Sequence, residues 1–424
     1  MISKLAKERM KMDNKIKAII AVAVVAVGMI GYSQISKEIN KDPEITGLQA
    51  EFVGKVGPGE SLSKSMFKVT GTTEAGKSVQ IDDFSSKTTT AAENGASCEV
   101  DIEAQGQSVT VIVDITREPV LEEDIGYPNE KSAKVTCYSN GDLEFTGKGD
   151  ITNFTKTLPW SSSTYSHVYI DDSLKIENMD SWFEGNKNLV YCDNLPKTLK
   201  TMKSTFAGCT TIKKTPDYFQ CSNLKIMDYA FSGCSALKEA DIIPVNVSSM
   251  KYTYANCSSL QKPISLNKTS NLTNVSGLYS GCINLREATE IPDSVIYMNE
   301  TYKDCINIKE AVKFPKSIEE ISATYEGCTG LLTGATIPES VINFTDCYNG
   351  CESLNGKLEI NSDSDSFEGA LMGATTNGDK LSISGNCGNL LAIQKNASNN
   401  NIVLADPEAA SKQNERLNRE KESQ

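Results

Sequence analysis

Thirteen cysteines and a single histidine set the limits on the chemistry that this sequence can perform. With His167 as the only imidazole, catalytic triads, histidine-based acid–base pairs and multi-histidine metal sites are excluded. We expect His167 to lie in a surface or half-buried strand. The cysteines are therefore the first residues whose spacing has to be explained.

Seven cysteines recur at a fixed step, which we call the Cys slot. Each has an aromatic residue three positions before it and a Leu or Ile three positions after it. An eighth copy has Asn186 in the slot, between Phe183 and Leu189, and successive slots are 23 or 25 residues apart. The seven slot cysteines are Cys209, Cys234, Cys257, Cys282, Cys305, Cys328 and Cys351. The aromatics that precede them are Phe206, Phe231, Tyr254, Tyr279, Tyr302, Tyr325 and Tyr348.

Three chemistries compete for the slot cysteines. Disulfides between neighbouring repeats are geometrically allowed, but an odd number leaves one thiol over. Metal binding is disfavoured because each repeat offers one Cys and no second ligand. Asn186 can form hydrogen bonds but no disulfide, so its presence in the slot favours buried, free thiols. The off-slot residues Cys98, Cys137, Cys192, Cys221, Cys347 and Cys387 have no histidine nearby that would make them nucleophiles.

Other site-like patterns have plainer explanations. Residues 71–78 fit a phosphate-binding loop, but the strand-like residues 79–81 follow where a helix is needed, so we predict a β-hairpin turn. Residues 361–365 resemble the start of a calcium loop, yet Ser366 and Met372 stand where glycine and glutamate are required. Trp160 and Trp182 are expected to cap the first repeats. We therefore predict no catalytic residue, no metal site and no cofactor.

The fixed step predicts a solenoid of about eight coils of 23–25 residues, because no single coil can bury its own apolar residues. Met, Val, Ile or Phe stands seven residues before every slot, and a proline stands thirteen before five of them. Stacked coils would align these residues in internal columns. Ligand-binding residues must lie at the variable positions between them, and they cannot be picked out from one sequence.

The N-terminus predicts a membrane anchor. Residues 1–17 form a basic segment with six Lys or Arg against two acids, and residues 18–36 carry no charge. An apolar segment of this length can cross a bilayer, with its basic flank in the cytoplasm. A cleaved signal peptide is the competing interpretation, but no A-x-A site follows. We expect a single-pass cell-membrane protein with an extracellular body.

Residues 45–119 are predicted to form a small β-sandwich. Val109, Val111, Val113 and Ile115 alternate with polar residues, as in a half-buried strand. The segment resembles bacterial Ig-like modules, which would imply a spacer. Residues 120–132 are acidic and contain Pro128, so we predict a linker there.

Residues 133–175 are predicted to be a β-hairpin cap of the solenoid, with Asn140-Gly141 at its turn. Pro159-Trp160 and a strand at residues 167–170 follow. A hairpin of the form N-G-x-L-x-F-x-G-x-G, then Pro-Trp, then repeated aromatic-x-x-Cys, resembles BspA-like leucine-rich repeat surface proteins. The resemblance covers roughly residues 133–405. It implies a mainly β leucine-rich repeat fold and a role in adhesion or cell-surface interaction.

The solenoid with its C-terminal cap is predicted at residues 176–405, with strands at 356–359, 381–384 and 402–404, followed by a polar tail at 406–424. A net charge of −13 disfavours nucleic acid as a partner. We expect a membrane-anchored extracellular protein that binds a protein or glycan. The alternative is a non-catalytic structural component of the cell envelope or of a mobile element. No group of residues in the sequence supports the activity of a hydrolase or another enzyme.

Overall fold

The computed structural model describes residues 44–92, 95–154, 157–218, 220–266 and 268–423. The predicted basic segment and membrane anchor, residues 1–17 and 18–36, lie outside these ranges. Within them, no helix is both long and apolar enough to cross a membrane. The chain divides into two compact units, and the boundary in the sequence falls between Thr116 and Arg117.

The first unit contains two antiparallel sheets that share one hydrophobic core. One sheet has the order β1 (Ile45–Phe52), β2 (Phe67–Thr73) and β3 (Ser78–Gln80), and the other β4 (Ser85–Ser86), β5 (Ser97–Ala104) and β6 (Gln107–Asp114). The short 3-10 helix η1 (Lys64–Met66) precedes β2. Val69, Val100 and Val113 are fully buried between the sheets. The predicted alternation in β6 is thus confirmed.

The second unit begins with a five-stranded sheet that caps the solenoid. Its order is β13 (Tyr191–Cys192), β11 (His167–Ile170), β9 (Asp142–Gly147), β8 (Ala133–Tyr138) and β7 (Pro119–Asp124). β7, β8 and β9 pair antiparallel, whereas β9, β11 and β13 pair parallel. A separate pair, β10 (Gly149–Asp150) and β12 (Leu174–Lys175), is also parallel. The predicted hairpin is confirmed, and β9 is the strand at which hairpin pairing changes to solenoid stacking.

The prediction of a linker at residues 120–132 is wrong. β7 pairs with β8, and η2 (Glu130–Ser132) completes the turn between them. An edge strand has one side in solvent, so the exposed acids that suggest a linker are compatible with pairing.

The start of β9 is fixed by a buried ion-pair cluster. The Arg117 guanidinium lies 2.8 Å from carboxylates of both Asp142 and Glu144 and stacks 4.0 Å from the Tyr138 ring centroid. Burial opposes the charge on Arg117, but hydrogen bonds with Glu144 and Asp142 raise its pKa above the usual value. Arg117 therefore holds the first residues of this unit against the cap.

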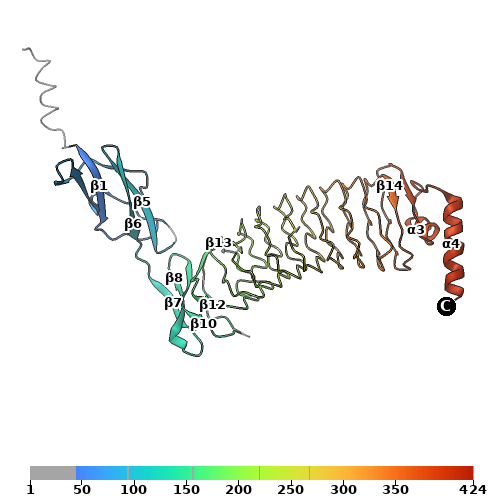
Figure 1. Cartoon of the computed structure of the whole chain (residues 1–424), viewed down its shortest axis with the longest axis horizontal. Coiled ribbons are helices and arrows are strands. Elements are labelled where there is room, and N and C mark those ends of the chain that lie inside the picture. Colours follow the sequence, from blue (N-terminus) through green and yellow to red (C-terminus); the bar gives the residue numbers. More distant parts are fainter. Residues whose placement is uncertain (1–43, 93–94, 155–156, 219, 267, 424) are drawn as a thin grey trace, which may run out of the picture. The chain divides into compact units, whose positions relative to one another are not determined.

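The coils that follow stack side by side between β13 and β14 (Figure 1). Numbered from the slot of Asn186, they are joined by parallel single-residue bridges at the position eight before each slot, from Asn178 through to Asn343. The residues seven before each slot, and the Leu or Ile three after it, are fully or nearly fully buried. From Phe206 to Tyr348 the aromatic rings form one stack, with centroids 5.2–6.0 Å apart and planes within 17°. The predicted internal columns are confirmed.

The slot cysteines are free and donate hydrogen bonds from one coil to the previous one. Cys305 Sγ lies 3.1 Å from the Tyr279 carbonyl oxygen, and the other six make the same contact at 3.0–3.2 Å. Each of these carbonyls also accepts the slot N–H of its own coil. Asn186 follows the same rule, since its amide donates to the Tyr165 carbonyl at 3.4 Å. The structure contains free thiols at these positions, as the sequence favours.

A second hydrogen-bond rule explains why some coils carry Tyr and others Phe. The hydroxyls of Tyr279, Tyr302, Tyr325 and Tyr348 accept the backbone N–H seven residues after the previous slot, at 2.9–3.1 Å. At that position before Phe231 stands Pro216, which has no N–H to satisfy. Before Tyr254 stands Asp241, whose N–H bonds Thr215, and the Tyr254 hydroxyl instead lies 3.2 Å from that of Tyr218. The hydroxyl is thus present where a buried backbone donor needs an acceptor.

The solenoid continues one coil beyond the eight predicted. Tyr348 N–H donates to Ala370 and Gly350 N–H to Met372, which repeats the contacts between earlier coils. Leu371 takes the aromatic position and Ala374 the Cys slot, and both are buried. Neither residue matches the pattern, so the ninth coil is hidden in the sequence.

The C-terminal end is closed by a sheet and two helices. β14 (Gly356–Glu359), β15 (Leu381–Ser384) and β16 (Ile402–Leu404) form a parallel sheet. The strands predicted at these residues are confirmed. α3 (Leu390–Ala397) lies between β15 and β16.

The predicted polar tail at 406–424 is wrong for the residues described, because Pro407–Glu422 form helix α4. Asp406 caps its first turn by accepting the Ala409 N–H. Arg416 and Lys421 form ion pairs with Asp363 and Asp365, and Leu417 is buried. These contacts compensate for the few apolar residues of α4.

The Tyr302 hydroxyl offers a test of the second hydrogen-bond rule. Tyr302→Phe leaves the buried Thr289 N–H without an acceptor, so we expect it to cost about 1–3 kcal/mol of unfolding free energy. Tyr302→Ala should cost about 3–5 kcal/mol because it also opens a cavity. Denaturant unfolding followed by circular dichroism measures both. Tyr297→Phe, at a tyrosine 39% exposed, is the control and should be neutral; equal effects of both Phe variants would contradict the rule.

The thiols offer a second test. Burial raises the pKa of Cys209, Cys282 and Cys328 to about 12, so these groups stay protonated at about pH 8. A thiol reagent added to the native chain should react at Cys98, which is half-buried, and spare the slot. Denatured, non-reduced protein should give all thirteen thiols. A count well below that would mean that disulfides are present.

Candidate binding surface

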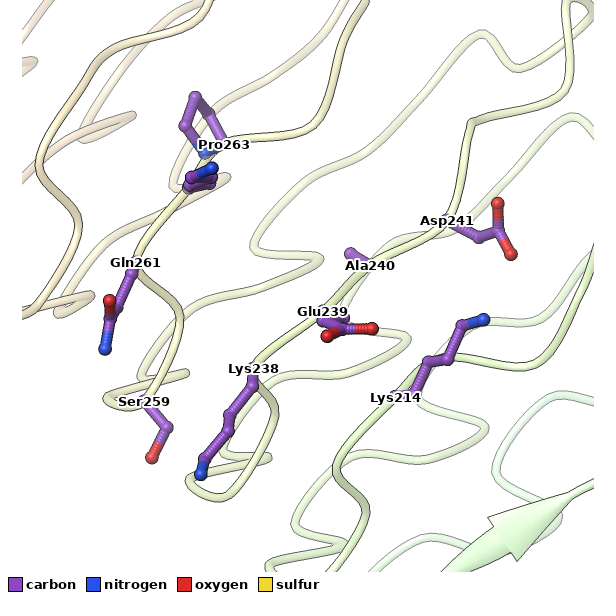
Figure 2. A pocket seen from close by; sticks show the side chains of 9 residues that line it. Lys214, Lys238, Glu239, Ala240, Asp241, Ser259, Gln261 and Pro263 are labelled. Atoms are coloured by element: carbon purple, nitrogen blue, oxygen red, sulfur yellow. The ribbon is translucent and has the colours of Figure 1, made fainter.

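The solenoid carries a groove where its regular stacking is interrupted. The second and fourth coils, which run from Cys209 to Cys234 and from Cys257 to Cys282, are each two residues longer than the others. The shorter third coil lies between them. The groove of about 660 Å³ follows this third coil, and its lining side chains come from all three (Figure 2). They are Lys214, Lys238, Glu239, Ala240, Asp241, Ser259, Gln261, Lys262 and Pro263.

A missing β-bridge accounts for the groove. Lys214 and Glu239, each five residues after its slot, form a parallel bridge. The next residue in this row is Lys262, and among the described residues no bridge joins it to Glu239. The row resumes only at Glu310 and Thr333. Pro263 follows Lys262 directly and has no N–H with which the row could continue to the next coil.

The groove carries charges of both signs, with three lysines against two acidic residues. Lys214, Lys238 and Lys262 come from three successive coils, and none of them makes an ion pair within the part of the chain that the structure describes. In Figure 2, Lys214 extends on the side of Glu239 and Asp241, whereas Lys238 lies toward Ser259 and Gln261. The Asp241 carboxylate accepts the Ile242 N–H at 2.8 Å. Such a surface can bind a partner through ion pairs and amide hydrogen bonds.

A second unusual surface lies beside the bridges that join the coils. The residue five before each slot has a left-handed backbone in all eight predicted coils, including Tyr229 with φ 58° and Tyr252 with φ 51°. The two tyrosine rings stack at 5.1 Å, and Tyr229 is 43% exposed. The Tyr252 ring lies over Gly277, where a Cβ would come within 2.1 Å of it. Sequence reasoning missed this surface, although glycine in register with Tyr252 is a signal for it.

The site-like patterns of the sequence do not form further sites. Residues 71–78 are the β2–β3 hairpin, as predicted, with Gly76 in its turn. Asp363 and Asp365 are engaged by Arg416 and Lys421 of α4. His167 lies half-buried in β11, with Nδ1 2.9 Å from Ser166 Oγ, and burial lowers its pKa although Asp142 opposes the shift. In the described ranges, no three His, Cys, Asp or Glu side chains are placed to hold a metal.

Trp160 lies in the cap, and Trp182 lies in the first coil beside it. Trp160 is fully buried and donates from Nε1 to the Trp182 carbonyl at 3.2 Å. Trp182 stacks on Phe145 of β9 at 5.3 Å. Their predicted capping role is confirmed.

Two protein families match the repeats. Residues 164–240 and 200–314 match the family described as Mycoplasma protein of unknown function, DUF285. Residues 275–401 match the BspA type leucine rich repeat region in six copies. No curated protein matches the chain.

Three bacterial repeat proteins are among the solved structures that the chain matches. A leucine-rich repeat protein from Bacteroides ovatus is 17% identical, with a TM-score of 0.41 over 63% of this chain and 76% of that one. One from Eubacterium ventriosum is 13% identical, with a TM-score of 0.30 over 63% and 85%. A leucine rich cell surface protein from Faecalibacterium prausnitzii is 14% identical, with a TM-score of 0.20 over 55% and 94%. Residues 275–401 of the chain are thus similar to BspA-type leucine-rich repeats, and the aromatic-x-x-Cys pattern of these coils continues upstream of them.

Proposed function

We propose that the chain is a membrane-anchored extracellular binding protein whose solenoid captures an acidic partner, either a protein or a glycan. The lysine-rich groove carries this proposal. Three lysines from neighbouring coils line it without ion-pair partners in the described ranges, so a ligand carboxylate or sulfate can replace water at their ammonium groups without breaking an existing contact.

The other parts of the chain support this role. Residues 18–36 serve as the anchor in this proposal, and the sandwich of β1–β6 serves as an Ig-like spacer. The interior of the coils is occupied by the aromatic and aliphatic columns, so recognition must use outward-facing residues. Among those, the groove has both concavity and charge. Its Glu239 and Asp241 would select partners that place a donor beside the acidic group.

The test is binding by the full chain in detergent micelles to arrayed glycans, matrix proteins and peptidoglycan. We expect saturable binding to at least one acidic component, with affinity that falls as salt is raised. A variant with Lys214→Glu, Lys238→Glu and Lys262→Glu should bind it at least about tenfold more weakly, the loss of about 1.4 kcal/mol.

The control carries Lys309→Glu, Lys313→Glu and Lys316→Glu, the same charge change on one later coil, and should bind like the parent. Equal loss in both variants would show that general charge, not the groove, attracts the ligand. No saturable binding to any component would favour the structural envelope role instead.

A further inference from the structure

The lysine-rich groove lies along a row of backbone groups that join other neighbouring coils. This row consists of the residues four to six after each slot, and we call it the groove row. Between the second and third coils, the N–H groups of Lys238 and Glu239 donate to the Lys213 carbonyl at 2.9 and 3.4 Å. The Thr215 N–H donates to the Glu239 carbonyl at 3.3 Å. The same three hydrogen bonds recur between the sixth and seventh coils.

Among the described residues, the junction of the third and fourth coils lacks all three of these bonds. The equivalent donors there are the N–H groups of Gln261, Lys262 and Ala240, and the equivalent acceptors are the carbonyls of Lys238 and Lys262. All four residues line the groove, so these backbone groups lie along its walls. Without a bound partner, water has to satisfy them.

The unused groups match the edge of a β-strand. The backbone N–H and carbonyl of Glu239 are bonded to the second coil, which leaves the Lys238 carbonyl and the Ala240 N–H for the opposite side. On the other wall, the N–H and carbonyl of Lys262 correspond in register to those of Glu239. One residue that pairs with the two residues flanking its opposite number is the pattern of parallel strands. An extended peptide that runs parallel to the coils can therefore pair with both walls.

The charges of the groove determine which peptide fits. Lys214, Lys238 and Lys262 reach it from three coils and attract carboxylates. The carboxylate of a glycan would satisfy the lysines equally, but regularly spaced backbone donors and acceptors match a peptide backbone. The volume of about 660 Å³ lies within the range of about 300–1,000 Å³ that ligand sites occupy.

We propose that the groove binds an extended acidic segment of a partner protein by β-strand addition. The backbone of the segment completes the groove row between the third and fourth coils, and its carboxylates pair with the groove lysines. Main-chain hydrogen bonds then supply affinity, and the side chains supply specificity. Because successive side chains of a strand point to opposite faces, the carboxylates should recur at every second residue. This inference rests on the proposed function and specifies its partner.

The test measures binding of the full chain in detergent micelles to arrayed heptapeptides. The peptides have the form x-Glu-x-Glu-x-Glu-x, where x is Val, Thr, Tyr or Ser. We expect saturable binding to a subset of them. The variant with Lys214→Glu, Lys238→Glu and Lys262→Glu should bind that subset at least about tenfold more weakly.

Backbone pairing is tested on the tightest of these peptides. N-methylation of its third, fourth and fifth amides in turn removes one backbone donor each time and leaves the charge unchanged. At least two of these three peptides should bind about tenfold more weakly or worse, because both edges of the added strand are paired. N-methylation of the first residue is the control and should have no effect.

A matched pair of variants tests the groove itself. Ala240→Pro removes the Ala240 N–H without a change of charge, and Pro263 already occupies the equivalent position in the fourth coil. This variant should keep its circular dichroism spectrum and bind the peptide at least about tenfold more weakly. Ala288→Pro makes the same change at the equivalent position of the fifth coil, outside the groove, and should bind like the parent.

The outcomes separate this inference from the proposed function. Peptide binding that depends on the lysines but is unchanged by N-methylation and by Ala240→Pro would overturn β-strand addition and leave the capture of an acidic partner intact. Binding of acidic glycans but of no peptide would do the same. No saturable binding to peptides, glycans or matrix proteins would overturn both.

Discussion

The solenoid depends on one backbone carbonyl per coil that accepts two hydrogen bonds. The carbonyl of each stacked aromatic residue accepts the slot N–H of its own coil, which closes the turn, and the slot thiol of the next coil, which sets the stacking. Removing either donor would leave a buried oxygen undersatisfied, which costs more than a surface contact gains. Because the thiol is also small and apolar, it fits between the aromatic and aliphatic columns without opening a void. This dual role explains why Cys fills seven slots and why Asn186, which can also donate, fills the one next to the cap.

Buried backbone N–H groups elsewhere in the coils are also matched with hydrogen-bond acceptors. Tyrosine hydroxyls satisfy N–H groups that no strand reaches, and phenylalanine appears beside Pro216, where there is no N–H to satisfy. The interior is therefore specified by hydrogen bonding as well as by volume. Because the interior side chains are occupied by packing and hydrogen bonding, any partner must be bound by the outward-facing residues. Coil length and charge vary among those residues. The groove lies where two coils that are each two residues longer flank a shorter one.

Much of this fold is predictable from spacing alone, because a periodic sequence must place equivalent residues in equivalent surroundings. The columns, the hairpin at Asn140-Gly141 and the strands β14–β16 follow directly. The ninth coil does not, since Leu371 and Ala374 keep the geometry while changing the residue types. Helix α4 has a visible start at Asp406 and Pro407, but what holds it, Arg416 on Asp363 and Lys421 on Asp365, depends on partners about fifty residues away. β7 is acidic and is identified only by its pairing with β8. The groove is anticipated only as two longer coils, and its lysines become neighbours only when those coils are stacked.

The comparison of Cys305→Ser with Cys305→Ala tests the central claim most directly. The two side chains differ by one hydroxyl, and both remove the thiol that donates to Tyr279. If the slot must supply a hydrogen-bond donor, Cys305→Ser should retain more unfolding free energy than Cys305→Ala, by about 0.5–1.5 kcal/mol. If the slot requires only a small apolar group, the order reverses, because the serine hydroxyl would be buried without need. Denaturant unfolding of the two variants under identical conditions gives the sign, and a more stable alanine variant would contradict the account.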